Sequence, residues 1–562
     1  MPFLASKYRR RIVMYLIDRY LEKVDFKDYD DFSKNLKYKP VEKFNFGYDV
    51  VDEYARLVPD KRALVWCNNK GEEHTFTFSD ISKLSNKVAN MLLKYGIKKG
   101  DFVMTMLNRR YEYYLVNVAC CKIGAILIPA TYLLTVKDIA YRINNAGVKA
   151  LFCINEKEVV DYVNEALPKC DSLKCAFTIG KQEGFIDMHE EMDLASDVLE
   201  LTEDQKPKLT DSMLVYFTSG TTGYPKMVTH NFKYPLGHIM TAYYWHAVID
   251  DGLHFTMAET GWAKFSWGKI YGQWLAGSAV FCYDYYGRFT PTDVLPLIAK
   301  YKITTFCAPP TIYRFLIREN LDDYDFSSLV SCTTAGEALN AEVFRLFKEH
   351  TGIEIREGFG QTESAVICAN FRYDNGKPGS CGKATPIYDL KLMDDCDQVV
   401  EGDNVEGEMV IKLRDDQFGL LCGYYNDPER TEAAFGTGYY HTGDLAMRDE
   451  TGTYWFVGRK DDIIKSSGYR IGPFEVESAL MEHPAVLECA ITGAPDPIRG
   501  QVVKATIILN KGYEPSDELT KDIQNHVKKA TAPYKYPRIV EYVTELPKTI
   551  SGKIMRKDIR KK

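Results

Sequence analysis

The chain has 562 residues, of which 45% are hydrophobic and 27% are charged, and its formal net charge is −7. This composition is typical of a globular protein, and the acidic balance argues against a general nucleic-acid binder, which needs a basic surface to neutralise phosphates. The length predicts three or four compact units of about 150 residues each.

The 14 cysteines are scattered, without a CxxC pair or a regular spacing. This pattern indicates neither a zinc site nor a disulfide framework, and it favours a reducing compartment. We therefore expect a soluble, cytoplasmic protein. Cys120 and Cys121 lie in an apolar stretch and are expected to be buried small hydrophobes.

The N-terminal segment MPFLASKYRRRIVMYLIDRYLEKVDF has three consecutive arginines followed by six apolar residues, without a small-residue cleavage site. It therefore does not have the pattern of a targeting segment. Ile12, Leu16, Tyr20 and Val24 share one helical face, which predicts a packed amphipathic helix, with contact to a membrane surface as the alternative. No apolar stretch of about 20 residues occurs, so no membrane span is expected.

From about residue 73, helical and strand patterns alternate. Ser79 is the expected N-cap of the first helix, which ends at Gly96. The inward face of that helix is formed by Ile81, Leu84, Val88, Met91 and Leu92. The next predicted elements are a strand over 102–107, a helix over 111–122, a strand over 125–130, a helix over 136–145 and a strand over 149–154. Such alternation predicts βαβ units around a largely parallel, buried sheet.

An apolar run over 213–217 leads into the stretch YFTSGTTGYPK, residues 216–226. Short hydroxyl side chains and glycines allow backbone N–H groups to converge on an anion, and Lys226 adds a point charge. The stretch is not a Walker A loop, because only two residues separate Gly220 from Gly223 and Met227 follows the lysine. Taken alone, a solvated turn between two strands is the simpler interpretation; a phosphate-binding turn is the alternative.

The alternation then continues with helices over 291–301, 311–319 and 341–350 and strands over 303–308 and 329–333. Beyond about residue 380, shorter strands such as 406–413 predict a β-rich subdomain. The charged and polar stretch 458–473 is the expected domain boundary, which divides the chain into 1–460 and 461–562. The second part has helical patterns over 475–482 and 517–529 and strand patterns over 487–492, 502–509 and 539–543, enough for a small α+β domain.

Four further stretches carry polar residues in short motifs: EGFGQTE (357–363), YHTGD (440–444), GRKDD (458–462) and PKTISGKIMR (547–556). Singly, they are typical of a strand end, a turn that holds Asp444, a charged linker and a basic tail. Together with 216–226, and with GWAK (261–264), GYYNDPE (423–429) and SSGYRIGP (466–473), the chain resembles the ANL superfamily of adenylate-forming enzymes over nearly its whole length. It is most similar to AMP-forming medium-chain acyl-CoA synthetases.

The resemblance implies an α/β fold: a large N-terminal domain of α/β sheets with a β-rich subdomain, and a small mobile α+β C-terminal domain. It implies that a medium-chain or branched carboxylic acid reacts with ATP to give acyl-AMP and pyrophosphate, and that the acyl group then passes to coenzyme A. Mg²⁺ is the implied metal, and a homo-oligomer is allowed. No protein nucleophile is needed.

The resemblance also implies roles for individual residues. The residues expected to bind ATP are Thr218, Ser219, Gly220, Thr221, Thr222, Gly223, Tyr224, Pro225, Lys226, Gly336, Glu337, Glu357, Gly358, Phe359, Gly360, Gln361, Thr362, Asp444, Arg459, Arg470 and Lys553. Among them, 218–226 would embrace the β- and γ-phosphates, Asp444 would accept hydrogen bonds from the ribose, and Ala335 to Glu337 with Phe359 would flank the adenine. The expected catalytic residues are Lys553, Thr362 and Glu363; Glu363 would hold Mg²⁺, since a hard cation prefers carboxylate oxygen.

For the second half-reaction, the C-terminal domain would swing about a hinge at Asp461. The residues expected on the coenzyme A side are Ser467, Gly468, Tyr469, Arg499, Tyr536, Pro537 and Arg538. Glycine at 468 would let the pantetheine pass close to the backbone.

Gly360 stands where acetyl-CoA synthetases, which this chain also resembles, carry a tryptophan that closes the acyl pocket. Its absence predicts an open tunnel of medium-chain scale. Trp262 and Trp267 are candidates for the tunnel wall, with core packing as an equal alternative. Lys264 is expected to face solvent, pair with a carboxylate or meet a polar substrate group, and we hypothesise that it tunes the choice of acid.

Other functions stay open at this stage. The same fold serves enzymes that act on aryl or short-chain acids, and others that load a carrier protein; a non-catalytic acyl-nucleotide binder is the alternative of another class. A P-loop kinase or ATPase would release ADP rather than AMP.

Overall fold

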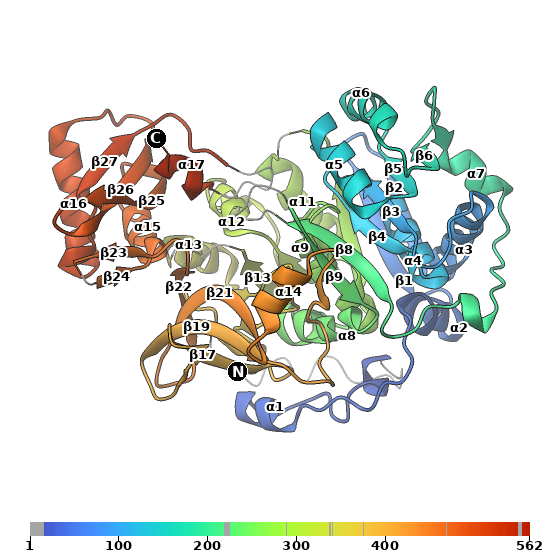
Figure 1. The fold of residues 1–562 in the computed structure, drawn as a ribbon, viewed down its shortest axis with the longest axis horizontal. Coiled ribbons are helices and arrows are strands. Elements are labelled where there is room, and N and C mark those ends of the chain that lie inside the picture. Colours follow the sequence, from blue (N-terminus) through green and yellow to red (C-terminus); the bar gives the residue numbers. More distant parts are fainter. Residues whose placement is uncertain are drawn as a thin grey trace.

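The computed structural model describes residues 16–218, 225–287, 289–336, 339, 341–374, 376–467, 469–548 and 554–561. Four sheets organise these residues, and Figure 1 shows the C-terminal elements gathered in a small unit at one end of a larger N-terminal part. The helices are α1 (Tyr29–Asn35), α2 (Glu53–Leu57), α3 (Phe78–Lys94), α4 (Glu112–Ile123), α5 (Val136–Ala146), α6 (Lys157–Ala166), α7 (Met188–Leu194), α8 (Tyr234–Ile239), α9 (Ala263–Gly268), α10 (Tyr271–Leu275), α11 (Pro291–Tyr301), α12 (Pro310–Leu316), α13 (Ala341–Thr351), α14 (Pro428–Phe435), α15 (Pro473–Met481), α16 (Asp517–Ala530) and α17 (Arg556–Arg560).

An eight-stranded sheet contains β8 (Ser212–Thr218), the strand that leads into the stretch 216–226. Its strands, in spatial order, are β20 (Gly423–Tyr424), β9 (Lys226–Asn231), β8, β4 (Ile126–Pro129), β3 (Phe102–Met106), β5 (Ala150–Cys153), β6 (Cys175–Thr178) and β7 (Ile186–Asp187). The strands from β8 to β7 pair in parallel, as the alternating pattern predicts, whereas β8 and β9 form an antiparallel pair that closes with Thr218 opposite Lys226.

A nine-stranded sheet contains β13 (Ser331–Ala335) and β14 (Ile355–Phe359), whose ends carry the residues expected to flank the adenine. Its order is β16 (Lys383–Ala384), β15 (Cys368–Ala369), β14, β13, β12 (Thr305–Cys307), β10 (Leu253–Thr256), β11 (Ala279–Asp284), β1 (Arg62–Asn68) and β2 (Glu73–Thr77). β13 and β14 run parallel with Ala335 opposite Gly358, so their carboxyl ends lie side by side. Ligands of open α/β sheets bind at such strand ends.

The predicted β-rich subdomain is an antiparallel five-stranded sheet of β18 (Val399–Val400), β17 (Asp389–Met393), β19 (Val405–Lys412), β21 (Tyr439–Arg448) and β22 (Tyr454–Arg459). The C-terminal unit has its own five-stranded sheet of β24 (Tyr469–Ile471), β23 (Ile464–Ser466), β26 (Gly500–Leu509), β25 (Val486–Asp496) and β27 (Ile539–Tyr542), and its own apolar core. The division of the chain after residue 460 stays a prediction.

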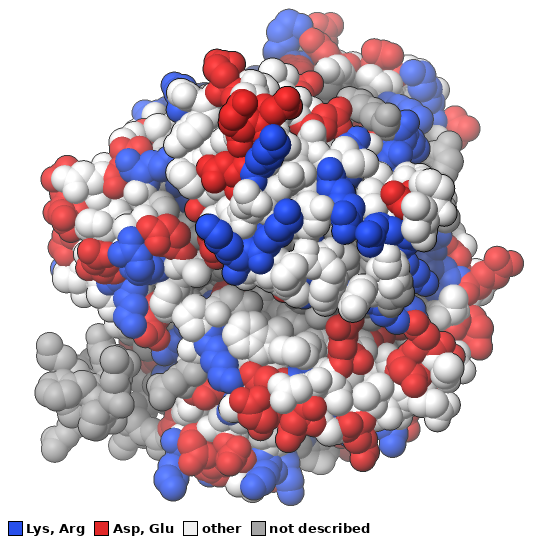
Figure 2. Space-filling model, turned by 90° about the vertical axis from the view of Figure 1, so that its left-hand side faces the viewer, with Lys and Arg blue, Asp and Glu red and all other residues white. Residues whose placement is uncertain are grey.

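The C-terminal unit docks on the β-rich sheet. Phe474 of α15 packs edge-on against Phe456 of β22 at 5.4 Å between ring centroids, and Arg470 forms an ion pair of 2.5 Å with Asp395. Figure 2 shows the face at this end of the molecule, where basic and acidic side chains are interspersed.

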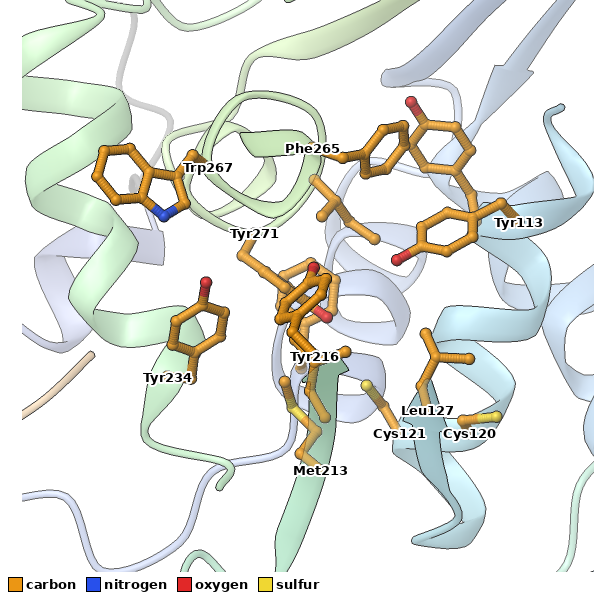
Figure 3. Packing of buried hydrophobic residues seen from close by; sticks show 14 of the residues in the cluster. Tyr113, Cys120, Cys121, Leu127, Met213, Tyr216, Tyr234, Phe265, Trp267 and Tyr271 are labelled. Atoms are coloured by element: carbon orange, nitrogen blue, oxygen red, sulfur yellow. The ribbon is translucent and has the colours of Figure 1, made fainter. Parts of the chain in front are cut away.

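The main core is rich in aromatic residues. Figure 3 shows part of it, with Tyr216, Tyr234, Trp267 and Tyr271 drawn from β8, α8, α9 and α10. Cys120 and Cys121 are buried in it, as predicted. None of the described helices is long and apolar enough to cross a membrane.

Two local predictions are wrong. The helix predicted through Leu16, Tyr20 and Val24 is a short 3₁₀ turn, Leu16–Arg19, after which Leu21 bridges to Tyr38 and the chain becomes extended; Ile12 lies outside the described residues. The first long helix is capped by Thr77 rather than Ser79, because Thr77 and Asp80 form a reciprocal capping box.

Candidate active site

Lys226, Glu363 and Tyr424 form a polar cluster between the two large sheets, in which Glu363 and Tyr424 are buried and Lys226 is half-buried. The Lys226 ammonium lies 2.5 Å from Glu363 Oε1, and the Tyr424 hydroxyl donates a hydrogen bond of 3.3 Å to the same oxygen. Burial and the nearby Glu363 carboxylate raise the pKa of Tyr424 well above its ordinary value, so this hydroxyl stays protonated. Antiparallel pairing of β20 with β9 brings Tyr424 to this place. Tyr424 lies within the stretch GYYNDPE, but no role for it is predicted from the sequence.

Asp444 lies in strand β21, opposite Arg459 of β22, and not in the predicted turn. The motif is turn-like because the strand is irregular here: the register with β19 shifts, and Gly443 has a φ of 70°. Gln361 Nε2 donates to Asp444 Oδ2 at 2.5 Å, and Tyr440 donates to Gln361 Oε1 at 2.7 Å. The ordered amide therefore fixes the direction of the carboxylate.

Arg459 extends this group toward the C-terminal unit. Its Nη1 lies 3.6 Å from Asp444 Oδ1, and its Nε lies 3.6 Å from Asp461, the expected hinge residue. Phe359 stacks on Phe456 at 5.9 Å, so the expected adenine-side ring also contacts the β-rich sheet.

Glu357 holds the backbone around the site. Its carboxylate accepts hydrogen bonds from Leu339 N at 3.1 Å and from Gly379 N at 2.5 Å, and burial raises the pKa of Glu357 to about 7. The side chain is thus engaged with two loops rather than directed at the Lys226 cluster.

His230 forms a hydrogen bond with the backbone of Thr362. His230 Nε2 lies 2.8 Å from the Thr362 carbonyl oxygen, so this nitrogen is the donor. Burial lowers the pKa of His230 to about 4, which keeps the ring neutral at pH 7. His230 is not predicted from the sequence, because no motif marks it and its contact depends on the pairing of β8 with β9.

Gly360 packs directly against Trp267. A Cβ atom at Gly360 would lie 2.2 Å from Cη2 of the Trp267 ring, which is far inside van der Waals contact. The indole of Trp267 thus fills the space beside Gly360 where the sequence predicts an open tunnel. Trp262 is half-buried immediately before α9, and Trp267 is buried near the end of that helix.

Lys264 is half-buried, and its ammonium donates a hydrogen bond of 2.8 Å to the carbonyl oxygen of Ala335. A backbone carbonyl was not among the partners expected for it. The bond ties α9, on the expected acyl side, to the end of β13, on the expected adenine side.

We expect Lys264→Met to lower kcat/KM for ATP about tenfold, since a hydrogen bond to a charged group contributes about 1.5–3 kcal/mol. Initial rates at varied ATP measure this change in kcat/KM, and initial rates with a panel of acids give the ranking of the acids. Lys264→Arg, which keeps a cationic donor, is the matched control. An unchanged ranking of acids in Lys264→Met would rule out the hypothesis that this lysine tunes the choice of acid.

The structure gathers some expected residues and leaves others apart. Arg470 pairs with Asp395, away from the Lys226 cluster. Ser467 accepts a hydrogen bond of 3.1 Å from Arg499, and Tyr469 stacks on Tyr534 with 4.2 Å between ring centroids. Arg538 donates a hydrogen bond of 2.8 Å to the Tyr536 hydroxyl. The residues expected to bind coenzyme A therefore contact other residues of the C-terminal unit. Pro537 accepts from Gln524 there. Ser219 to Tyr224, Glu337, Gly468 and Lys553 lie outside the described residues.

Two family models match the chain. The AMP-binding enzyme model covers residues 51–425, and the model of the AMP-binding enzyme C-terminal domain covers residues 475–553. The chain belongs to the AMP-binding enzyme family. The predicted family and the predicted α/β fold class are confirmed.

Individual relatives agree with this membership over nearly the whole chain. Acyl-coenzyme A synthetase ACSM3, mitochondrial, of Mus musculus is 40% identical over 550 residues, which cover 96% of this chain and 94% of the relative. Acyl-coenzyme A synthetase ACSM4, mitochondrial, of Mus musculus is 42% identical over 547 residues, 94% of this chain and 93% of the relative. The crystal structure of the anthranilate CoA ligase AuaEII with anthranoyl-AMP has a TM-score of 0.83 and 29% identity, and the match covers 93% of this chain and 98% of that one.

A divalent cation fits the position of Glu363 in this AMP-binding enzyme. Among the described residues, no group of three or more His, Cys, Asp or Glu side chains could hold a metal by itself. A single carboxylate suffices for Mg²⁺ that arrives on nucleotide phosphates. Glu363 already faces a cation, the ammonium of Lys226.

Proposed function

We propose that the chain is an AMP-forming acyl-CoA synthetase that activates a medium-chain or branched carboxylic acid. The observation that carries the proposal is the convergence of Lys226, Glu363 and Asp444, from segments far apart in the sequence, in one polar site of an AMP-binding enzyme. The names of the relatives as acyl-coenzyme A synthetases support the transfer to coenzyme A.

In the first step, a carboxylate oxygen of the acid attacks the α-phosphorus of ATP, and the bond to the β-phosphate oxygen breaks. Two anions must meet, so fixed positive charge and amide donors around the phosphates lower the barrier. Lys226 supplies such charge, and Lys553 supplies it where the new bond forms. Mg²⁺, held by Glu363, would neutralise phosphate charge when bound.

The ribose would bind Asp444, which Gln361 and Arg459 hold in place. The Thr362 carbonyl is anchored by His230, which fixes the backbone on which the Thr362 hydroxyl reaches a phosphate oxygen. In the second step the thiol sulfur of coenzyme A attacks the acyl carbonyl carbon, and AMP leaves. Ser467, Tyr469, Arg499 and 536–538 would receive coenzyme A.

Nucleotide product analysis tests the proposal. With ATP, coenzyme A and a series of acids from acetate to decanoate and benzoate, we expect AMP and pyrophosphate in equal amounts, and acyl-CoA from medium-chain acids. ADP would indicate a kinase or ATPase, absence of turnover a nucleotide-binding protein, and preference for benzoate an aryl-acid enzyme.

Lys553→Ala separates the half-reactions. We expect this variant to lose adenylate formation by at least 100-fold, while thioester formation from added acyl-AMP is kept. Equal loss of both steps would contradict the assigned role of Lys553.

The compartment has two candidates. The scattered cysteines favour the cytoplasm or another reducing compartment, and the names of the relatives make mitochondria the second candidate. Fractionation of cells that express the full chain distinguishes the two.

A further inference from the structure

Among the described residues, several buried side chains near Trp267 carry unpartnered polar atoms, including Tyr234, His238, His246 and Gln273. Tyr234, His238 and His246 are at most 1% exposed. Within the described part of the chain, His238 Nε2 and His246 Nε2 have no hydrogen-bond partner. The Tyr234 hydroxyl forms no hydrogen bond of normal geometry with another described residue; the Trp267 indole N–H interacts with its oxygen, which leaves the hydroxyl proton without an acceptor. An unpaired buried polar atom costs about 1–3 kcal/mol, so several of them in one region indicate a polar partner that binds from outside the chain.

Tyr234 and His238 lie in α8, and His246 directly follows the π-helical turn Met240–Trp245 that continues α8. π-Helical turns occur frequently at functional sites. The rings of Tyr234 and His238 lie 4.5 Å apart, and His238 lies 6.2 Å from Trp267. In Figure 3 the Tyr234 hydroxyl points to the side of the cluster where the Trp267 indole lies.

The same region adjoins the proposed reaction centre. Trp267 packs against Gly360, two residues before Thr362. His230, which holds the Thr362 carbonyl, stacks on Tyr234 at 3.9 Å. Tyr234 and His238 are therefore linked to the backbone of Thr362 through His230 and to Gly360 through Trp267.

The protonation of His246 follows from its neighbour Gln273. Gln273 Nε2 donates to the Trp267 carbonyl oxygen at 3.0 Å, which fixes the amide orientation, and the same nitrogen lies 3.1 Å from His246 Nδ1. Nδ1 is thus the acceptor, and Nε2 of the neutral ring carries a proton.

Both imidazoles are uncharged. Burial lowers the pKa of His238 to about 3, and burial together with nearby His254 and Lys264 lowers the pKa of His246 well below its ordinary value. The group therefore offers neutral hydrogen-bonding atoms, and it offers no charge to a second carboxylate.

We infer that the acid carries an uncharged polar group, a hydroxyl or a carbonyl, on its tail, and that Tyr234, His238 and His246 bind this group. The inference rests on the proposed function and narrows its substrate class. A plain alkyl chain in this place would leave the Tyr234 hydroxyl proton, His238 Nε2 and His246 Nε2 without a partner from the described part of the chain.

The test compares hexanoate with 4-, 5- and 6-hydroxyhexanoate, 5-oxohexanoate and adipate, with ATP and coenzyme A. We expect at least one hydroxy or oxo acid to exceed hexanoate at least tenfold in kcat/KM, because a site built for a polar group discriminates strongly against its absence. Adipate should be poorer than the best neutral polar acid.

Tyr234→Phe removes one hydroxyl and little else. It should reduce the advantage of the polar acid over hexanoate at least tenfold. Tyr271→Phe is the matched control, because Tyr271 is buried in the same core and its hydroxyl is bonded to Asn117 at 2.9 Å; it should leave the ratio unchanged. Thermal unfolding of both variants checks that they are folded.

The outcomes separate the two proposals. If hexanoate gives AMP and acyl-CoA but no polar acid is preferred, the inference fails and the proposed function stands. If no acid gives AMP, the proposed function itself fails. Equal loss of the ratio in Tyr234→Phe and Tyr271→Phe would also overturn the inference, because it would indicate a general effect on the core.

Discussion

Glu363→Gln is expected to lower kcat/KM for adenylate formation by about 100- to 1,000-fold, the range seen when a preorganised electrostatic contact is removed. The amide cannot hold a hard cation as a carboxylate does, and it leaves the Lys226 ammonium, now 2.5 Å from Glu363 Oε1, without its counter-charge. Pyrophosphate release measured at varied MgATP gives the kinetic effect. The rise in unfolding temperature that MgATP produces should shrink in parallel, as a readout independent of turnover.

Glu53→Gln is the matched control for this substitution. Glu53 Oε1 lies 2.5 Å from Arg19, the same distance as in the Glu363 pair, but it belongs to α2, apart from the Lys226 cluster. This control should change stability slightly and leave pyrophosphate release at the wild-type rate. If Glu363→Gln behaved like Glu53→Gln, Glu363 would be a structural residue and the assigned metal role would be wrong.

The site residues that the sequence predicted are those with short, specific motifs. Lys226, Glu363 and Asp444 lie in stretches that are unspecific alone but, taken together and in this order, resemble those of adenylate-forming enzymes, although 137 and 81 positions separate the three residues in turn. Tyr424 and His230 complete the same site without such a mark. Their positions depend on which strand pairs with β9 and on backbone contacts made in the folded state, and these are long-range properties of the fold.

Elements with strong local signals were predicted well. Helix α11 begins at Pro291 and ends before Lys302, which has a left-handed φ of 53°, and its predicted range is correct. The residues Thr-Gly-Asp predict a turn at Asp444, because glycine and aspartate are typical of turns. Pairing of β21 with two neighbouring strands outweighs that preference and converts the motif into an irregular strand.

The acyl side shows why an absent side chain is a weak basis for predicting a cavity. Glycine at 360 does leave room, but the room is taken by the Trp267 ring, which comes from α9, nearly 100 positions earlier in the chain. Gly358 is packed in the same way, with a Cβ position 2.5 Å from Cε2 of Trp245. Gly358 in β14 and Gly360 just after it thus each pack against an indole ring from a distant segment of the chain.

We therefore expect Gly360→Trp to reduce kcat/KM for hexanoate at least 100-fold and to affect acetate much less. No side chain fits at 360 unless Trp267 moves, because even a Cβ would lie 2.2 Å from its ring. A displaced indole would occupy the volume needed by the acyl tail, and each excluded methylene changes kcat/KM by about 10- to 200-fold. Steady-state rates for acetate, butyrate, hexanoate and octanoate measure the shift.

Trp267→Ala and the double variant Gly360→Trp/Trp267→Ala complete the cycle. The single variant Trp267→Ala should raise kcat/KM for octanoate relative to hexanoate, because loss of the indole opens space beside Gly360 for a longer acyl tail. The double variant exchanges one indole for another at the same contact, so it should recover part of the hexanoate activity lost in Gly360→Trp. If the ratio of hexanoate to acetate stayed at the wild-type value in Gly360→Trp, the acyl tail would not pass this contact, and the acyl pocket would have to lie elsewhere.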